Sequence, residues 1–145
     1  MILGIGTDLA DIARIGKTLE KHKGRFIERC FAKTERDHVE KSGKGNKKLR
    51  AAGYAKRWAA KEACAKALGL GIRSDIYLKD IIVTNDANGK PSLTFKGGAK
   101  DRLTAMTPGG MTLQAHLSLT DDGLMAMAFV VLSAVAKKTK KAKKT

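Results

Sequence analysis

The first third of the chain combines one short β-prone run with helical periodicity. Residues 2–7 alternate glycine with larger side chains, which predicts a strand that ends at Asp8. Asp11 is placed to cap the next helix, because an aspartate accepts hydrogen bonds from the free N–H groups of a first helical turn. The apolar residues of that helix recur at helical spacing and should face the core: Ile12, Ile15 and Leu19.

Three more helices are predicted in the middle of the chain. A short one covers residues 25–31, and Thr34 gives the N-cap signal of a second. The longest covers residues 48–68, where strong helix formers dominate, and Gly69 and Gly71 can end it.

One stripe of the longest helix is small and apolar at the spacing i, i+3, i+4, i+7, i+8, so it should face the core. Its members are Ala60, Ala63, Cys64, Ala67 and Leu68. Glu62 and Lys66, four residues apart, share the opposite face and point toward solvent or a ligand.

The remainder of the chain is mostly β-prone. Residues 81–83 and 93–95 flank a glycine-containing turn and predict a hairpin, and residues 97–107 predict a helix. Residues 113–120 alternate apolar and polar side chains as a half-buried strand does, and the apolar run 124–135 returns as its partner. This order predicts an α+β fold, a single domain with helices packed on an antiparallel sheet.

Composition adds a tail and a basic surface to this picture. The 145 residues, 43% of them hydrophobic, suffice for one domain over residues 1–136. Residues 137–145 hold six lysines and no apolar side chain larger than alanine, which predicts a disordered tail. Residues 9–57 hold 15 basic and 6 acidic side chains out of a net charge of +15. An acidic partner is therefore expected, whether nucleic acid, membrane or protein.

Two features predict a cytoplasmic protein. No run approaches the roughly 20 apolar residues of a membrane span, and the N-terminus lacks the basic start and apolar stretch of a signal peptide. Cys30 and Cys64 lie far apart and have no metal-binding spacing, so both are predicted to be reduced core residues.

Common nucleotide-binding motifs are absent, since there is no P-loop and residues 4–6 lack the third glycine of a dinucleotide fingerprint. Carboxylates with a lysine nearby suit Mg²⁺ held against a phosphate. The candidates are Asp8, Glu62, Lys66, Asp121 and Asp122. A cap, a helical ion pair and a turn are the ordinary alternatives for such residues.

Two blocks carry a resemblance to a known family. Residues 4–15 read Gly-Ile-Gly-Thr-Asp-Leu-Ala-Asp-Ile-Ala-Arg-Ile, and residues 57–63 read Arg-Trp-Ala-Ala-Lys-Glu-Ala, continued by Lys-Ala-Leu-Gly-Leu-Gly-Ile at 66–72. They resemble the signature of the small bacterial phosphopantetheinyl transferases, the holo-acyl-carrier-protein synthase family. Supporting segments follow in family order, and the resemblance covers about residues 2 to 133.

The resemblance implies an enzyme of fatty acid biosynthesis. Such an enzyme moves phosphopantetheine from coenzyme A to a serine of an acyl carrier protein, releases adenosine bisphosphate and requires Mg²⁺. It also implies a cytoplasmic homotrimer with coenzyme A bound at the subunit boundary. The lysine tail lies outside the resemblance.

Site residues follow from the matching positions. Asp8 and Glu62 match the metal-binding carboxylates and, with Lys66, make up the implied catalytic set. The serine proton would pass to Glu62, to Asp8 or to a metal-held water. The coenzyme-binding segments correspond to Arg57, Lys66, Gly69, Gly71, Pro91 and Asp121. Asp121 stands where many members have histidine, so it could approach the metal or shape the turn.

The family docks its acidic carrier protein at positions that correspond to Arg14, Arg25, Phe26 and Arg29. These residues lie inside the basic segment 9–57, which composition identified independently. The alternative is a small basic module that binds RNA or another polyanion through its first helix and its tail.

Overall fold

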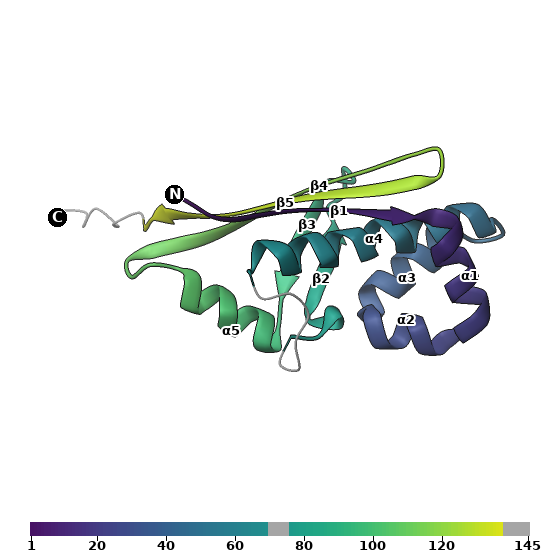
Figure 1. The fold of residues 1–145 in the computed structure, drawn as a ribbon, viewed down its shortest axis with the longest axis horizontal. Helices are drawn as coiled ribbons and strands as arrows, with labels where there is room; N and C mark the ends of the chain where they lie inside the picture. The colour runs from purple at the N-terminus through teal and green to yellow at the C-terminus, as the bar shows by residue number, and fades with distance from the viewer. Residues whose placement is uncertain (70–75, 138–145) are drawn as a thin grey trace, which may run out of the picture.

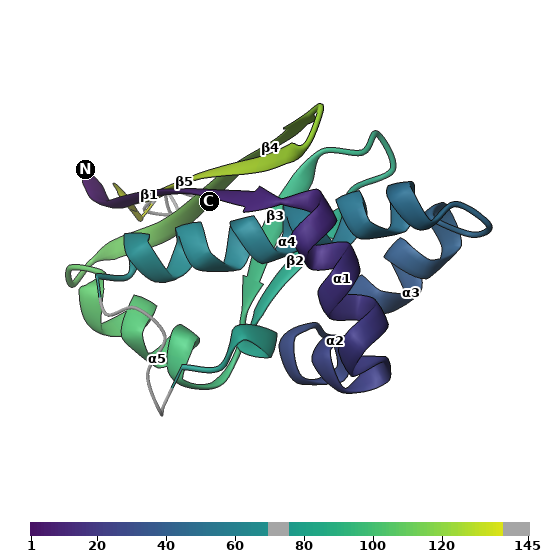
Figure 2. The same ribbon diagram turned by 45° about the vertical axis from the view of Figure 1, so that its right-hand side comes forward.

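Two antiparallel sheets and five α-helices make up the part of the chain that the computed structural model describes, residues 1–69 and 76–137. Figures 1 and 2 show their arrangement from two sides. In chain order the elements are β1 (Ile2–Asp11), α1 (Ile12–His22), α2 (Gly24–Cys30), α3 (Lys33–Ser42), α4 (Lys47–Ala67), the 3₁₀ turn η1 (Leu78–Asp80), β2 (Ile81–Asn85), β3 (Pro91–Phe95), α5 (Gly97–Met106), β4 (Met111–Asp122) and β5 (Met125–Ala136).

The larger sheet has the strand order β1-β5-β4, and β4 and β5 form a long hairpin (Figure 1). β2 and β3 pair separately. Alternate residues of β5 point inward and are buried: Ala126, Ala128, Val130, Leu132 and Ala134. The outer sheet face carries exposed apolar residues of β1 and β5: Ile5, Leu9, Met125, Met127, Phe129 and Val135. Because successive side chains of a strand point to opposite faces, one face of this sheet lies in the core and the other is apolar and exposed.

α4 lies along the inner face of the larger sheet, with α1, α2 and α3 near its N-terminal half and α5 near its C-terminal end (Figures 1 and 2). Asn46 caps α4 by accepting a hydrogen bond from the Leu49 N–H at 3.0 Å. Gly4 and Gly6 let β1 approach the α4 backbone. A Cβ on Gly6 would overlap the carbonyl oxygen of Ala63, and one on Gly4 would overlap that of Ala67.

Both cysteines are free and buried, as the sequence predicted. Burial raises the pKa of the Cys64 thiol to about 12. It also raises the pKa of Cys30, although the nearby Lys61 charge opposes that shift. Both side chains belong to the hydrophobic core.

The predicted α+β fold class is confirmed, as are the helix capped by Asp11, the long central helix and both hairpins. Two details were wrong. β1 continues through Asp8 to Asp11 because residues 8–11 still pair with β5, so Asp8 lies within the strand. Thr34 is not the N-cap of α3. The N-cap is Ala32, two residues earlier, and the Glu35 carboxylate accepts a hydrogen bond from the Ala32 N–H at 2.8 Å.

Parts of the sequence predictions lie outside the described residues. Gly71 is one of them. The others are residues 138–145, which make up all of the predicted tail except Lys137. Within the described ranges, no helix has both the length and the apolar character that a membrane crossing needs.

Candidate active site

Asp8 and Lys66 form the centre of a charged cluster between β1 and the last turns of α4. The Lys66 ammonium donates to Asp8 Oδ1 at 2.8 Å and to the Thr7 carbonyl oxygen at 2.8 Å. The Asp8 side chain is 18% exposed and that of Lys66 is 55% exposed. The pair is therefore anchored in the fold on one side and open to solvent on the other.

Glu62 lies one helical turn before Lys66 and is half-buried. Its pKa is raised, chiefly because burial disfavours the charged carboxylate and then because of the Asp8 charge, while Lys66 lowers it. The two carboxylates are thus close enough to repel each other. The structure brings together Asp8, Glu62 and Lys66, which the sequence analysis had selected from distant positions.

This cluster fits Mg²⁺. The described residues contain no group of three or more His, Cys, Asp or Glu side chains that could hold a metal by themselves. Mg²⁺ does not need one, because it commonly binds one or two protein carboxylates and takes its other oxygens from phosphate and water. The mutual repulsion of Asp8 and Glu62 is what a divalent cation between them would relieve.

Two hollows adjoin the Lys66 side chain. One, of about 350 Å³, is lined by Thr7, Asp8, Leu9, Lys66 and Met127. The other, of about 290 Å³, is lined by Ile5, Gly6, Thr7, Lys66 and Phe129. Together they lead from the charged cluster over β1 to the outer sheet face.

Arg57 lies on a different side of α4 from Lys66. It is only 5% exposed to solvent. Its guanidinium donates to Asn85 Oδ1 at 2.9 Å and to the Gly53 carbonyl oxygen at 3.4 Å. Its Nε has no partner among the described residues. Burial lowers the pKa of Arg57 because the positive charge is poorly solvated. A cation bonded only to neutral groups is suited to receive an anion.

The other predicted coenzyme-binding residues divide between these two sides of α4. Gly69 follows the Lys66 turn, with φ +74°, and its N–H donates to the Lys66 carbonyl oxygen at 3.0 Å. Pro91 pairs with Asn85 across the β2–β3 hairpin and so lies near Arg57. One chain therefore does not bring all of them to one place.

Asp121 is two strands away from Asp8, at the end of β4, because β5 lies between β4 and β1. It forms an ion pair with Lys56 at 2.7 Å. Within one chain it thus fixes the end of the β4–β5 hairpin against α4.

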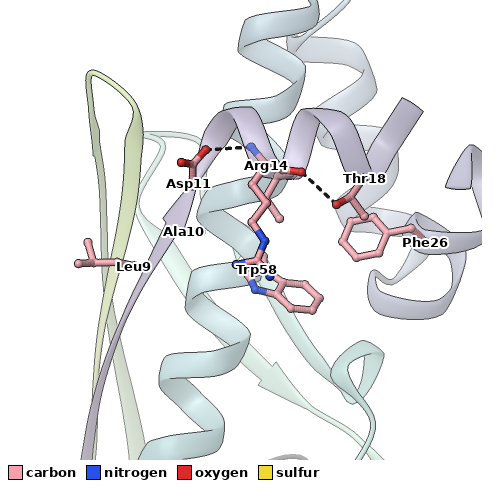
Figure 3. Close-up of a pocket in the computed structure, with 8 residues that line it drawn as sticks. Leu9, Ala10, Asp11, Arg14, Thr18, Phe26 and Trp58 are labelled. Carbon is pink, nitrogen blue, oxygen red and sulfur yellow. Dashed lines mark hydrogen bonds between the residues drawn. The ribbon is translucent and has the colours of Figure 1, made fainter. Parts of the chain in front are cut away.

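The predicted carrier-docking residues lie around Phe26. A cavity of about 240 Å³ is lined by Leu9, Ala10, Asp11, Arg14, Ile15, Thr18, Phe26 and Trp58 (Figure 3). An adjoining hollow of about 510 Å³ is lined by Thr18, His22, Arg25, Phe26 and Arg29. We call the residues that line both the docking surface. Sequence reasoning missed Thr18 and Trp58, although Thr18 follows Arg14 by one helical turn.

Sequence reasoning also missed a buried ion pair on another side of α4. The Lys61 ammonium contacts Glu35 Oε2 at 2.8 Å, and both side chains have 0% exposure. The signal was present, because Lys61 shares helical spacing with the core residues Cys64 and Leu68.

Comparisons with known proteins agree with the resemblance. A family model described as the 4′-phosphopantetheinyl transferase superfamily matches residues 4–116. A holo-[acyl-carrier-protein] synthase of Rhodopseudomonas palustris strain TIE-1 is 53% identical over 135 residues, which is 93% of this chain and 92% of that protein.

Solved structures give the same result. The holo-[acyl-carrier-protein] synthase of Neisseria meningitidis is 34% identical with a TM-score of 0.78, over 92% of this chain and 99% of that one. The Helicobacter pylori holo-[acyl-carrier-protein] synthase, in complex with coenzyme A, is 29% identical with a TM-score of 0.72, over 89% and 99%.

Proposed function

The chain belongs to the 4′-phosphopantetheinyl transferase superfamily, and from that premise we propose that it transfers phosphopantetheine from coenzyme A to a serine of an acyl carrier protein, with Asp8 and Glu62 holding Mg²⁺. The observation that carries the site assignment is the convergence of two carboxylates and a lysine from β1 and α4. The names of the relatives, at about half identity over most of the chain, support the reaction.

Asp8 and Glu62 would hold the metal, which when bound neutralises negative charge on the pyrophosphate of coenzyme A. Lys66 adds a positive charge beside both carboxylates and would bind phosphate oxygens. The serine oxygen forms the new bond to phosphorus, and the bond to the departing adenosine bisphosphate breaks. The serine proton passes to Glu62, to Asp8 or to a water that they hold.

Arg57 is proposed to bind a phosphate of coenzyme A, since it matches a coenzyme-binding position of the family and its guanidinium hydrogen-bonds only to neutral groups. Arg57 and Pro91 lie on a different side of α4 from Asp8. A homotrimer would let one subunit supply the metal side and its neighbour supply Arg57. The uncovered outer sheet face, which adjoins both hollows beside Lys66, supports such an assembly.

The docking surface is proposed to receive the acyl carrier protein. Arg14, Arg25 and Arg29 would meet its acidic side chains, while Phe26 and Trp58 offer apolar contact. A cytoplasmic location remains a prediction of the family resemblance.

Intact mass measurement tests the function. The chain is incubated with coenzyme A, Mg²⁺ and apo carrier protein, and the carrier should gain a covalently attached phosphopantetheine. Chelation of Mg²⁺, Asp8→Asn or Glu62→Gln should nearly abolish the gain, whereas the exposed carboxylate variant Asp101→Asn on α5 should leave it unchanged.

Near-normal turnover of Asp8→Asn or Glu62→Gln at saturating Mg²⁺ would refute the metal assignment. A polyanion-binding module would behave differently. It would form no covalent product and would lose affinity for RNA steeply as salt rises.

A further inference from the structure

The contact between α4 and β1 beside the cluster is made of very small residues. Gly4 and Gly6 face the backbone of α4 at Ala63 and Ala67, so strand and helix nearly touch. Such a contact allows close approach, but it offers few large side chains that could interlock and resist rotation of the helix. Some other contact must set the rotation of α4 about its own axis.

The buried Lys61–Glu35 pair provides directional contacts on another side of the same helix. The Lys61 ammonium donates to Glu35 Oε2, to the Leu78 carbonyl oxygen at 3.0 Å and to the Ile81 carbonyl oxygen. All three of its donor positions are therefore used. The bonds tie α4 to α3, η1 and β2 at one point.

Glu35 is equally well bonded. Its Oε2 also accepts from the Ala32 N–H at 2.8 Å, and its Oε1 accepts from the Val83 N–H at 3.0 Å. Neither charged group can move without leaving buried partners unpaired, which costs free energy.

Stability alone does not account for this pair. A buried ion pair must overcome the desolvation of both charges, and apolar side chains of similar volume often give equal or greater stability. What apolar side chains cannot supply is direction. Hydrogen bonds weaken steeply when misaligned, so they hold a helix at one rotation.

Lys61 immediately precedes Glu62, so the two side chains point about 100° apart around the helix axis. With Lys61 fixed toward Glu35, Glu62 lies one helical turn before Lys66, whose ammonium bonds to Asp8, and so on the side of α4 that faces Asp8. We propose that Lys61 and Glu35 are positioning residues that fix the rotation of α4 and thereby the separation of Glu62 from Asp8. This inference rests on the proposed roles of Asp8 and Glu62.

The test replaces both charges with apolar side chains of similar length, Lys61→Met with Glu35→Met. The double variant should fold with a lower unfolding midpoint, because the backbone groups of Ala32, Val83 and Leu78 lose their side-chain partners, and it is assayed below that midpoint. Its affinity for Mn²⁺ alone, measured by electron paramagnetic resonance of the free ion, should fall by about 10- to 100-fold. Its kcat should fall similarly, while the KM for carrier protein stays unchanged.

A matched control is the Glu40–Arg50 pair, which also joins α3 to α4. Arg50 lies twelve residues before Glu62 on α4. The double variant Glu40→Gln with Arg50→Met should lower stability and leave Mn²⁺ affinity unchanged. Unchanged Mn²⁺ affinity and kcat in the folded Lys61/Glu35 double variant would overturn the proposal.

If that double variant does not fold, Glu35→Asp decides, because it keeps the charge and shortens its reach by one methylene. Weaker Mn²⁺ binding by folded Glu35→Asp supports the proposal, and unchanged binding overturns it. Glu62→Gln separates the two levels of inference. If Glu62→Gln keeps Mn²⁺ affinity and turnover, the proposed metal site is wrong. If Glu62→Gln loses both while the Lys61 and Glu35 variants match the unmodified protein, the metal site stands and only the positioning role is wrong.

Discussion

Lys66 contributes to the charge balance of the proposed active site. Its ammonium bonds to Asp8 and lowers the pKa of Glu62, whereas burial and the Asp8 charge raise that pKa. A raised pKa means that Glu62 takes up a proton at a higher pH than an ordinary glutamate. The carboxylate form, which is proposed to bind the metal, is therefore lost at a higher pH as the pH falls.

We expect Lys66→Met to raise the pKa of Glu62 further, because it removes the charge that lowers this pKa. The acid limb of kcat/KM should move to higher pH, and kcat/KM for coenzyme A should fall by about 10- to 100-fold if the proposed phosphate contact is lost. Carbon-13 NMR titration of the glutamate carboxyls, with Glu62→Gln for assignment, measures the pKa. An acid limb that moves to lower pH would contradict this charge balance.

Glu40 predicts a pH dependence of stability. The hydrogen bond from Arg50 lowers its pKa, burial opposes this, and the Tyr54 hydroxyl, at 2.7 Å, adds to the lowering. The stability that it contributes is thus present above the pKa of an unfolded glutamate and lost as the pH falls through the lower folded pKa. Glu40→Gln should have a lower thermal midpoint than the unmodified protein at pH 7, and the difference should shrink in acid. A constant difference from pH 7 to pH 3 would argue against it.

At the scale of elements, the close packing of α4 on β1 depends on the absence of side chains on Gly4 and Gly6. Both glycines face helix backbone, which cannot move aside as a flexible side chain can. The register of β1 against β5 holds them under the helix and directs Asp8 to the same side.

Gly6→Ala should therefore push α4 away from β1, lowering the free energy of unfolding by about 1–3 kcal/mol and reducing turnover. Chemical denaturation measures the first effect. Gly16→Ala on α1 is the matched control, since its Cβ would lie 3.6 Å from that of Ala51, an ordinary contact. That variant should be neutral or slightly stabilising. Equal losses in both variants would contradict the packing argument.

The sequence predicted most of these elements because periodicity and caps are local signals. It did not show that Asp8 lies within β1, since the four residues after it form strand only by pairing with β5. It missed Lys61 because a lysine is normally solvated, and only the partners from α3 and β2 make its burial tolerable. Helical spacing and the resemblance both selected Glu62, and the fold then placed it one turn before Lys66, which bonds to Asp8.

On the scale of the whole molecule, the described residues expose a basic docking surface and an apolar outer sheet face. The predicted family membership is confirmed, and the relatives' names support an acyl carrier protein as partner, while its acidity stays a prediction. The two surfaces predict separate effects, one on carrier binding and one on assembly.

Arg14→Glu should weaken binding of apo carrier protein by about tenfold or more, because it places a negative charge against an acidic partner. The KM for coenzyme A should stay unchanged, since Arg14 lies outside the Asp8 cluster. Isothermal titration with each substrate separates these effects. Lys100→Glu on α5 makes the same charge change away from the docking surface. Equal losses for both substrates in Arg14→Glu would count against the docking assignment.

Phe129→Asp should convert the proposed homotrimer to monomers, because a carboxylate would be buried in an apolar contact. Light scattering after gel filtration measures the mass. Phe129→Asp should also lose coenzyme A binding. Thr94→Asp on the exposed side of β3 should leave the mass of the assembly and coenzyme A binding unchanged. A Phe129→Asp trimer would show that the outer sheet face is not the interface.

The burial of both thiols makes the protein convenient to label. Cys30 and Cys64 are shielded within the core with raised pKa values, so maleimides should leave the folded chain unmodified. A single cysteine introduced at the rim of the docking surface would then take one fluorophore at a known position. Energy transfer to a dye on the carrier protein could follow the encounter of the two proteins in real time.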